Sequence, residues 1–313
     1  MDLSKDFVFK PLPPIEDGDS TTSSFAAAAA TSTVTLGRLT DLRGKWQGTG
    51  FNVIWRPNSV PGQDRFLQLN VTNETLEFER IPGDIPNRGF LQGDINMHGL
   101  NYLQQITDAN LDNAGLHFEP GIWAHVPKTT NPKESVSIVR MASIPHGTTI
   151  VAQGNSNTSD ETTKPSIPTV SIKPFGIGDP TGTIDFPEQN LKTATKFRTP
   201  AAGLVGVTQA MVNDPNTVLK AAIAGQNITS TIRLQVTTRP TPVLGGGTAN
   251  TAFLGGGPDG PNAVASLVTS TFWLEKLNNE AQASQLQYTQ TVLLDFAGLS
   301  WPHVTVATLR RVA

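Results

Sequence analysis

The sequence contains no cysteine among its 313 residues. This absence excludes disulfide bonds, thiolate metal sites and a thiol nucleophile, and it fits a reducing compartment. Charged residues are also scarce, at 16%, and the net charge is only −3 with an isoelectric point near 6.0. Such a chain has no global basic field, so we expect no nucleic-acid partner.

Long hydrophobic runs are missing as well. No apolar segment approaches the roughly 20 residues that span a membrane. The opening MDLSKDFVFKPLPP has no hydrophobic signal-peptide region. We therefore expect a soluble cytoplasmic protein with no membrane partner, and the sequence leaves a homodimer open.

Glycine (28) and proline (23) are plentiful, which is typical of short strands joined by many turns. In residues 65–71, Leu67, Leu69 and Val71 share one face, the half-buried pattern of an antiparallel sheet. We expect strands at 50–56, 65–71, 75–81, 100–106, 115–125, 135–143, 148–153, 229–237, 265–277, 285–295 and from 301 to the end. Regularly spaced short strands of this kind indicate a barrel or a sandwich.

Two regions lack the strand pattern. Residues 1–33 read as a partly disordered N-terminal arm of low complexity. Residues 155–225 read as a long insertion, a polar loop followed by a helix over 203–225 with Asp214 as N-cap and Gly225 as stop. We therefore predict a single β-barrel domain over 34–313 with this insertion. The glycine-rich stretch 245–257 lacks the spacing of a phosphate-binding loop.

A histidine stands at the head of the last expected strand, in WPHVTVATLRRVA. With period two, Thr305, Ala307 and Leu309 share the face of His303, which predicts an interior position. A neutral imidazole there suits haem iron, which makes His303 the candidate metal ligand. The alternative is a strand-end histidine that is capped by solvent or by a backbone carbonyl.

His117 and Glu119 lie two residues apart on one expected strand and so point to the same side. Such a pair can polarise a ligand or hold a water molecule for acid–base catalysis, which makes both residues candidate catalytic groups. The alternative is a buried polar pair that the backbone satisfies.

Two further residues stand at expected rims of the barrel. His146 lies between proline and glycine in a turn, where it is a candidate distal group over a ligand or simply an exposed side chain. Arg56 ends a strand, and its guanidinium is a candidate partner for a carboxylate or a haem propionate. The alternative for Arg56 is a solvated rim charge.

Gly44-Lys45-Trp46 resembles the Gly-x-Trp opening of calycin barrels, the group that includes lipocalins and fatty-acid-binding proteins. The resemblance implies an all-β, antiparallel up-and-down barrel in which the tryptophan closes one end. A basic residue of the final strand lies across that tryptophan, either Arg310 or Arg311, and we assign Arg310 together with Gly44 and Trp46 to barrel closure. Stacking of this kind is worth about 1 kcal/mol.

Three segments resemble the nitrobindin-like haem proteins, in family order. They are WQGTG at 46–50, GLHFEPGIW at 115–123 and WPHVTVATLRR at 301–311. The resemblance implies haem b with His303 as proximal ligand, and we assign His146, Arg56 and Trp123 to the cofactor site beside it. That family is much shorter, and the insertion has no counterpart in it.

Three functions follow from these expectations. The first is a haem-binding barrel that acts on nitric oxide, peroxynitrite or peroxide. The second is a haem-free barrel that binds an apolar small molecule, lipid-like or polyketide-like. The third is an isomerase or cyclase that uses His117 and Glu119.

Overall fold

The computed structural model describes residues 35–58, 64–144, 146–157, 160–241, 245–257 and 262–312. The arm that we predicted over residues 1–33 lies outside the described residues. Within these ranges no helix has both the length and the hydropathy required to cross a membrane.

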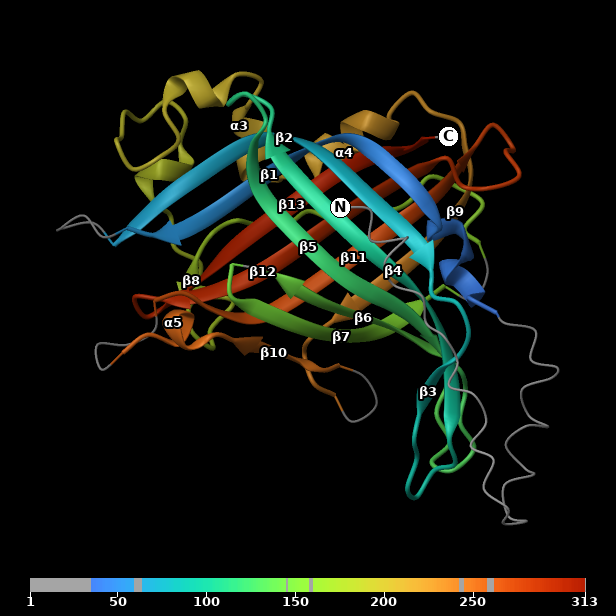
Figure 1. Cartoon of the computed structure of the whole chain (residues 1–313). Helices are drawn as coiled ribbons and strands as arrows, with labels where there is room; N and C mark the ends of the chain where they lie inside the picture. Colours follow the sequence, from blue (N-terminus) through green and yellow to red (C-terminus); the bar gives the residue numbers. More distant parts are fainter. Residues whose placement is uncertain are drawn as a thin grey trace, which may run out of the picture.

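Ten antiparallel strands form a closed barrel, which confirms the predicted fold class (Figure 1). Each strand pairs with the next in the order below, and the last pairs with the first. The strands are β1 (Gly44–Pro57), β2 (Arg65–Arg80), β4 (Ile95–Asp108), β5 (Ala114–Val126), β6 (Ser137–Ile144), β7 (Thr148–Ser156), β9 (Ile228–Thr237), β11 (Val264–Leu277), β12 (Gln285–Phe296) and β13 (Leu299–Val312). Three short strands extend this wall: β3 (Ile85–Asn87), β8 (Phe175–Gly176) and β10 (Gly247–Asn250).

The first and last strands close the barrel over a long register, from Lys45 opposite Val312 to Val53 opposite Val304. Gly48 lies within this seam, and a Cβ atom there would meet the carbonyl oxygen of Thr308 at 2.1 Å. Glycine therefore allows the two strands to approach at this point.

Residues 65–80 form one continuous strand, whereas we predicted two strands with a break at Asn73. Asn73 pairs with both Thr49 and Thr107, so the ladder continues through it. Its side chain is exposed on the outer face and donates to Asn113 Oδ1 at 2.7 Å. A polar residue on the solvent face does not interrupt a strand, because only the inner face must be apolar.

The insertion lies between β7 and β9 and packs on the outside of the barrel wall. It contains η2 (Pro187–Gln189), η3 (Ala201–Leu204), α3 (Gln209–Asn213) and α4 (Thr217–Ile223) in place of the single helix expected over 203–225. Asp214 is the C-cap of α3, and Asn216 is the N-cap of α4. The Asp214 carboxylate accepts from the backbone N–H groups of Asn216 and Val170, both at 3.1 Å. The extended backbone of Asp214, which precedes Pro215, separates the two helices.

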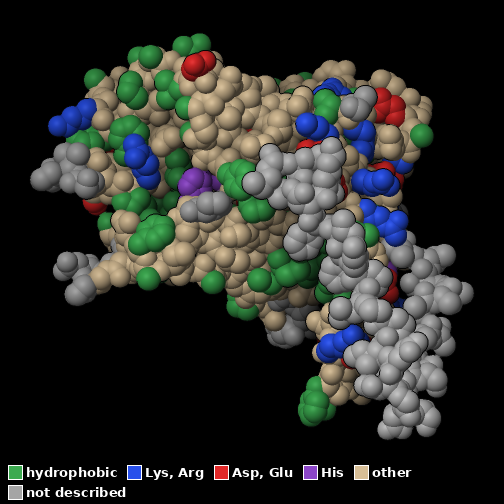
Figure 2. All heavy atoms as spheres, viewed as in Figure 1, with side chains coloured by type: hydrophobic (Ala, Val, Ile, Leu, Met, Phe, Trp, Pro, Cys, Tyr) green, Lys and Arg blue, Asp and Glu red, His purple; other side chains and the backbone are tan. Residues whose placement is uncertain are grey.

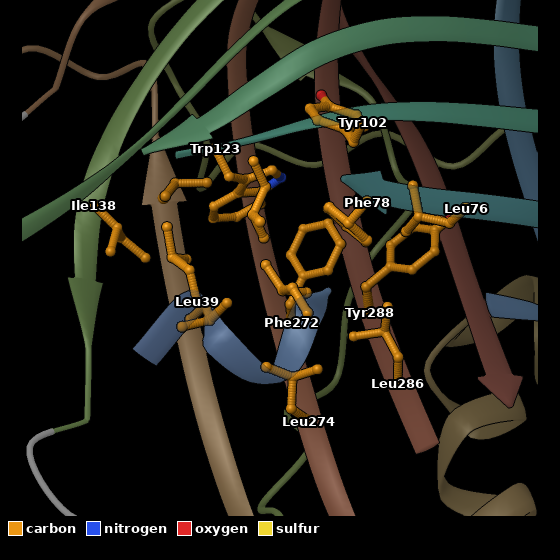
Figure 3. Close-up of a cluster of buried hydrophobic side chains, with 14 of the residues drawn as sticks. Leu39, Leu76, Phe78, Tyr102, Trp123, Ile138, Phe272, Leu274, Leu286 and Tyr288 are labelled. Atoms are coloured by element: carbon orange, nitrogen blue, oxygen red, sulfur yellow. The ribbon is translucent and has the colours of Figure 1, made fainter. Parts of the chain in front are cut away.

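The barrel has two apolar cores, one inside and one outside its wall. Figure 3 shows part of the inner core, in which Leu39 lies among Phe78, Trp123 and Phe272. The outer core lies beneath the insertion and includes Trp55, Trp301, Phe51, Val53, Leu219 and Ile223. Because both faces of β1 are covered along this part, the run FNVIW in 51–55 is almost continuously apolar.

One end of the barrel is closed by the 3-10 helix η1 (Gly37–Leu42) and by Trp46, as the calycin resemblance implied. The indole of Trp46 donates to the carbonyl of Leu42 at 2.7 Å. The guanidinium of Arg311 lies 4.3 Å from the Trp46 ring centre, and it donates to the carbonyls of Asp41 at 2.6 Å and Ala283 at 2.8 Å.

The assignment of Arg310 to this closure is wrong. Arg311 is the residue opposite Trp46 in the β1–β13 register, so the two share the inner face. Arg310 alternates to the outer face and is exposed. Gly44 has φ +115°, a left-handed conformation that turns the chain from η1 into β1.

Candidate functional site

A cavity of about 340 Å³ lies in the half of the barrel away from Trp46. Apolar side chains form much of its wall, among them Ile54, Ile106, Leu116, Ile144, Val268 and Val292. Three of the five histidines of the chain line it: His117, His146 and His303. Figure 2 shows histidine at the surface beside hydrophobic side chains, and His146 is exposed, so the cavity reaches solvent.

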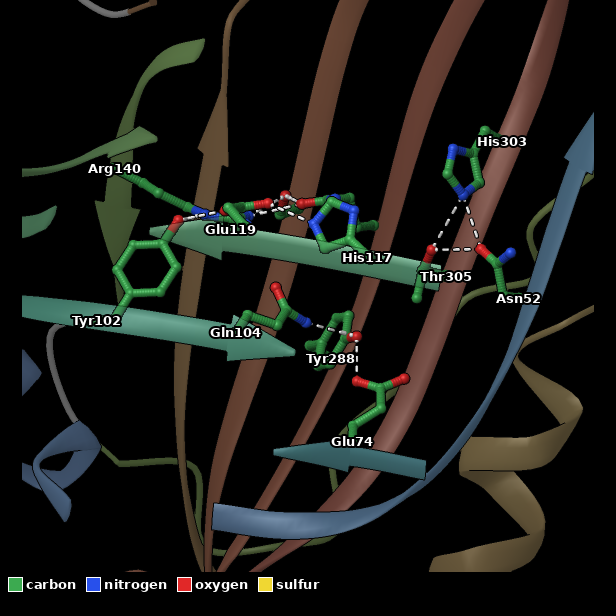
Figure 4. Close-up of polar contacts among 12 residues, drawn as sticks. Asn52, Glu74, Tyr102, Gln104, His117, Glu119, Arg140, Tyr288, His303 and Thr305 are labelled. Carbon is green, nitrogen blue, oxygen red and sulfur yellow. Dashed lines mark hydrogen bonds and ion pairs between the residues drawn. The ribbon is translucent and has the colours of Figure 1, made fainter. Parts of the chain in front are cut away.

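His303 lies on β13 and points into the barrel, as the period-two pattern predicted. Its Nε2 is 2.7 Å from Oδ1 of Asn52 on β1 (Figure 4). Thr305 donates its hydroxyl to the same Asn52 oxygen at 2.9 Å. The ring is therefore fixed by side chains from both strands of the closing seam.

A chain of side-chain amides determines which nitrogen of His303 has the proton. Asn70 donates to Asp108 Oδ2 at 2.6 Å, and its own Oδ1 accepts from Asn52 Nδ2 at 3.5 Å. The Asn52 oxygen must then face His303, and an amide oxygen can only accept. Nε2 of His303 is consequently the protonated nitrogen, and Nδ1 has the lone pair.

The imidazole of His303 is neutral over the physiological pH range. Burial lowers the pKa of His303 to about 3, and nearby His117 and His146 contribute to the shift in the same direction. No group in the described part of the chain hydrogen-bonds Nδ1 of His303, which lies on the ring side away from Asn52 (Figure 4). An uncharged imidazole nitrogen with a lone pair is thus available at the cavity.

His117 is held by a fully buried ion pair. Its Nε2 donates to Oε2 of Glu119 at 3.0 Å, and Arg140 donates to the other oxygen of Glu119 at 2.5 Å. Burial alone would raise the pKa of Glu119, but the charge of Arg140 and the bond from His117 outweigh it and lower that pKa to about 2. Glu119 is therefore an ionised acceptor that orients His117.

Arg140 connects this pair to several strands of the barrel. It donates to the Tyr102 hydroxyl at 2.9 Å, to Ser270 Oγ at 3.1 Å and to Gln290 Oε1 at 2.6 Å. Burial would lower the pKa of Arg140, but the carboxylate of Glu119 raises it above its usual range. A buried charge requires such partners, and through them Arg140 on β6 fixes the position of the Glu119 carboxylate on β5.

A second buried carboxylate has no cationic partner among the described residues. Glu74 on β2 accepts from the Tyr288 hydroxyl at 2.6 Å, and Tyr288 in turn accepts from Gln104 at 2.9 Å. Burial raises the pKa of Glu74 to about 7, against the opposing bonds from Tyr288 and Thr72. Tyr288 and Gln104 line the cavity, so this titratable acid lies directly behind its wall.

The mouth of the cavity is formed by the β6–β7 turn, by Arg56 at the end of β1 and by α5 (Ala252–Gly255), which contributes Leu254. The ring of His146 lies 5.5 Å from that of His117, and burial, followed by the charge of His117, lowers the pKa of His146. Gly147 has φ +119°, and a Cβ atom there would meet Leu254 at 2.8 Å. Glycine therefore lets α5 pack against the histidine turn.

The structure brings most of the predicted site residues together. His303, His117, His146 and Arg56 line one cavity, although Arg56 and His303 are 247 positions apart in sequence. Glu119 lies behind His117. Trp123 does not line the cavity but belongs to the inner core, with its ring 5.2 Å from that of Phe272.

Several polar residues of the site were missed in the sequence: Asn52, Gln104, Tyr288, Gln290 and Thr305. Each stands at an inward position of a strand whose inner face is mostly apolar. A polar residue at such a position is the signal that could have identified them, since buried polar groups require partners.

The donor set fits a haem better than a bare metal ion. Among the described residues no group of three or more His, Asp or Glu side chains is placed to hold a metal. A haem supplies four ligands itself and requires one neutral imidazole and apolar surroundings. His303 and the walls of the cavity provide both.

No protein-family model matches the sequence, and no curated protein matches it either. Among solved structures the fold is similar to the crystal structure of Rv2717c from M. tuberculosis, with 14% sequence identity and a TM-score of 0.38. The likeness covers 88% of this chain and 95% of that chain. A likeness at this score adds nothing to the assignment of the barrel, which rests on the strand pairing.

Proposed function

We propose that the barrel binds haem b in the cavity, where Nδ1 of His303 would hold the iron. The observation that supports this proposal is the neutral, oriented imidazole whose Nδ1 has no hydrogen-bond partner among the described residues. When bound, ferric haem supplies an iron centre at which nitric oxide or a peroxide can coordinate.

Asn52 and Thr305 position the ligand histidine. Histidines that bind metals usually donate their second ring N–H to a neighbouring acceptor, which fixes the tautomer and the ring orientation. Asn52 is that acceptor here, at 2.7 Å. The amide chain to Asp108 keeps the Asn52 oxygen on this side.

His117 and His146 are the polar groups available to a small molecule at the iron. His117 donates Nε2–H to Glu119, so its Nδ1, which no described residue hydrogen-bonds, can accept a hydrogen bond from a ligand. Arg56 at the mouth is positively charged and exposed, which suits a propionate that extends into solvent.

A hemin titration of the purified protein tests the proposal. We expect a saturable shift of the Soret band in the wild-type protein and its loss in His303→Ala. His98→Ala is the matched control, because His98 lies on β4 outside the cavity and should leave the titration unchanged. An unchanged titration in His303→Ala, or no shift in the wild type, would refute the assignment.

A haem-free apolar ligand is the second candidate, favoured by the aliphatic side chains that form much of the cavity wall. At about 340 Å³ the cavity lies at the lower end of the usual range for small-molecule pockets, about 300–1,000 Å³. Fluorescence of a naphthalene-sulfonate probe would detect this mode. Binding of the probe with no Soret shift would select the second candidate over the first.

A further inference from the structure

A second groove lies on the outer wall of the barrel, between the strands and the insertion. Its volume is about 410 Å³, and it is lined by β7, β9, β11 and β12 on one side and by residues 168–170 and Asn216 on the other. It is separate from the haem cavity, because the lining residues of the two sites do not overlap.

The wall of this groove is a regular array of uncharged polar side chains, which we name the threonine grid. One row crosses four strands in direct register, Gln153–Thr237–Thr269–Thr291. The next row is Asn155–Gln235–Thr271–Thr289. With strands about 4.8 Å apart, each row is about 14 Å long.

Most of the grid hydroxyls have no hydrogen-bond partner among the described residues. Within the described ranges no residue hydrogen-bonds the side chains of Thr269, Thr271, Thr289 or Thr291. Thr269 is exposed, whereas Thr271 and Thr289 are half-buried, so the grid extends from solvent to a covered inner end.

The inner end of the groove has two buried polar atoms without partners. Asn216 is fully buried, with its Nδ2 donating to the Pro168 carbonyl at 2.9 Å, while its Oδ1 has no partner in the described structure. Thr289 Oγ1 is likewise buried and unpaired. Buried polar atoms without partners are rare, and a ligand that donates a hydrogen bond would satisfy each of these two oxygens.

The chemistry of the lining selects a neutral ligand. None of the residues that line the groove is Asp, Glu, Lys, Arg or His, so the groove offers no partner for a charged group. Threonine presents a hydroxyl that donates and accepts, together with a methyl group, and the amides add further donors and acceptors. A sugar has the same combination of hydroxyl groups and apolar C–H faces.

We propose that the threonine grid and Asn216 bind a neutral oligosaccharide along the outer wall of the barrel. Sugar hydroxyls would donate to Asn216 Oδ1 and exchange hydrogen bonds with the threonine rows. The site is distinct from the cavity described above, since no residue lines both.

Saturation-transfer NMR and calorimetry with maltohexaose, cellohexaose and chitohexaose test this proposal. We expect at least one of these neutral sugars to bind the wild-type protein at millimolar concentration. The double variant Thr271→Val/Thr289→Val keeps the side-chain shape and removes two hydroxyl groups, so we expect at least about a tenfold loss of affinity.

Two controls make the result specific. Thr49→Val removes an exposed hydroxyl from β1, outside the groove, and His303→Ala removes the haem ligand; both should bind the sugar as the wild type does. Absence of binding to all three sugars would mean that the groove holds ordered water only and would overturn the proposal. Full binding by the double valine variant would overturn it equally.

Discussion

At the residue scale, the protonation state of His303 follows from neighbours rather than from its own position in sequence. Asn52, Asn70 and Asp108 form a directional chain that ends in a carboxylate, and burial keeps the ring neutral. The same environment that disfavours the imidazolium ion leaves a nitrogen lone pair in the cavity. A histidine that binds a Lewis-acidic atom must be uncharged, and its nitrogen lone pair must face that atom.

We predict that His303 is a neutral, Nε2-protonated ring at pH 7 and remains neutral down to about pH 4, because its pKa is lowered to about 3. Long-range ¹H–¹⁵N spectra of the apoprotein would show this tautomer directly. In Asn52→Leu the acceptor is removed, so we expect mixed tautomers and a 10–100-fold loss of hemin affinity. An Nδ1-protonated ring in the wild type would contradict the proposed ligand atom.

Glu74 gives the protein a second residue-scale property, a stability that depends on pH. Its pKa is raised from 4.5 to about 7 in the folded protein, so the folded state binds more protons than the unfolded state between these values. The free energy of unfolding therefore decreases as pH rises through this window. The full effect is on the order of 3 kcal/mol.

Glu74→Gln should remove that dependence, since glutamine mimics the protonated acid. Urea unfolding at several pH values should show the variant gaining stability relative to the wild type as pH rises from about 4.5 to 7 and above. Burial also raises the pKa of Glu275 to about 7. The difference in unfolding free energy between variant and wild type cancels the contribution of such groups, because both proteins contain them. A difference that stays constant with pH would show that Glu74 is ionised in the fold.

At the scale of elements, alternation along each strand determines most of the architecture. The sequence pattern located the barrel strands because inward positions are mostly apolar, and it placed His303 on the inner face of β13. It missed the continuity of β2 at Asn73, where the polar residue simply faces outward. It also predicted one helix where the extended backbone of Asp214, ahead of Pro215, separates α3 from α4.

The closing seam makes a prediction that distinguishes two adjacent arginines. Arg311→Ala loses the stacking on Trp46 and the bonds to backbone carbonyls, and we expect a loss of about 2–3 kcal/mol in the free energy of unfolding. Arg310→Ala removes an exposed charge and should change stability by less than about 0.5 kcal/mol. Thermal unfolding of both variants checks this. Equal losses of stability would contradict the assignment of Arg311 to the inner face and Arg310 to the outer face.

At the scale of the whole molecule, the site exists only when the barrel is closed. His303 and Asn52 are 251 residues apart in sequence and meet through the pairing of β1 with β13. The class of fold and four of the cavity residues could be predicted from local patterns. The partners Asn52, Gln104 and Tyr288 could not, because their roles depend on which strands become neighbours around the wall.

The placement of the two ends of the barrel wall has a practical consequence. Lys45 and Val312 pair beside the plug formed by η1 and Trp46, while Arg56 and His146 mark the mouth in the other half of the barrel. Lys45 is exposed, so its side chain is an attachment point at the end of the barrel away from the mouth. A tether at the same place would fix the protein to an electrode with its mouth towards the solution.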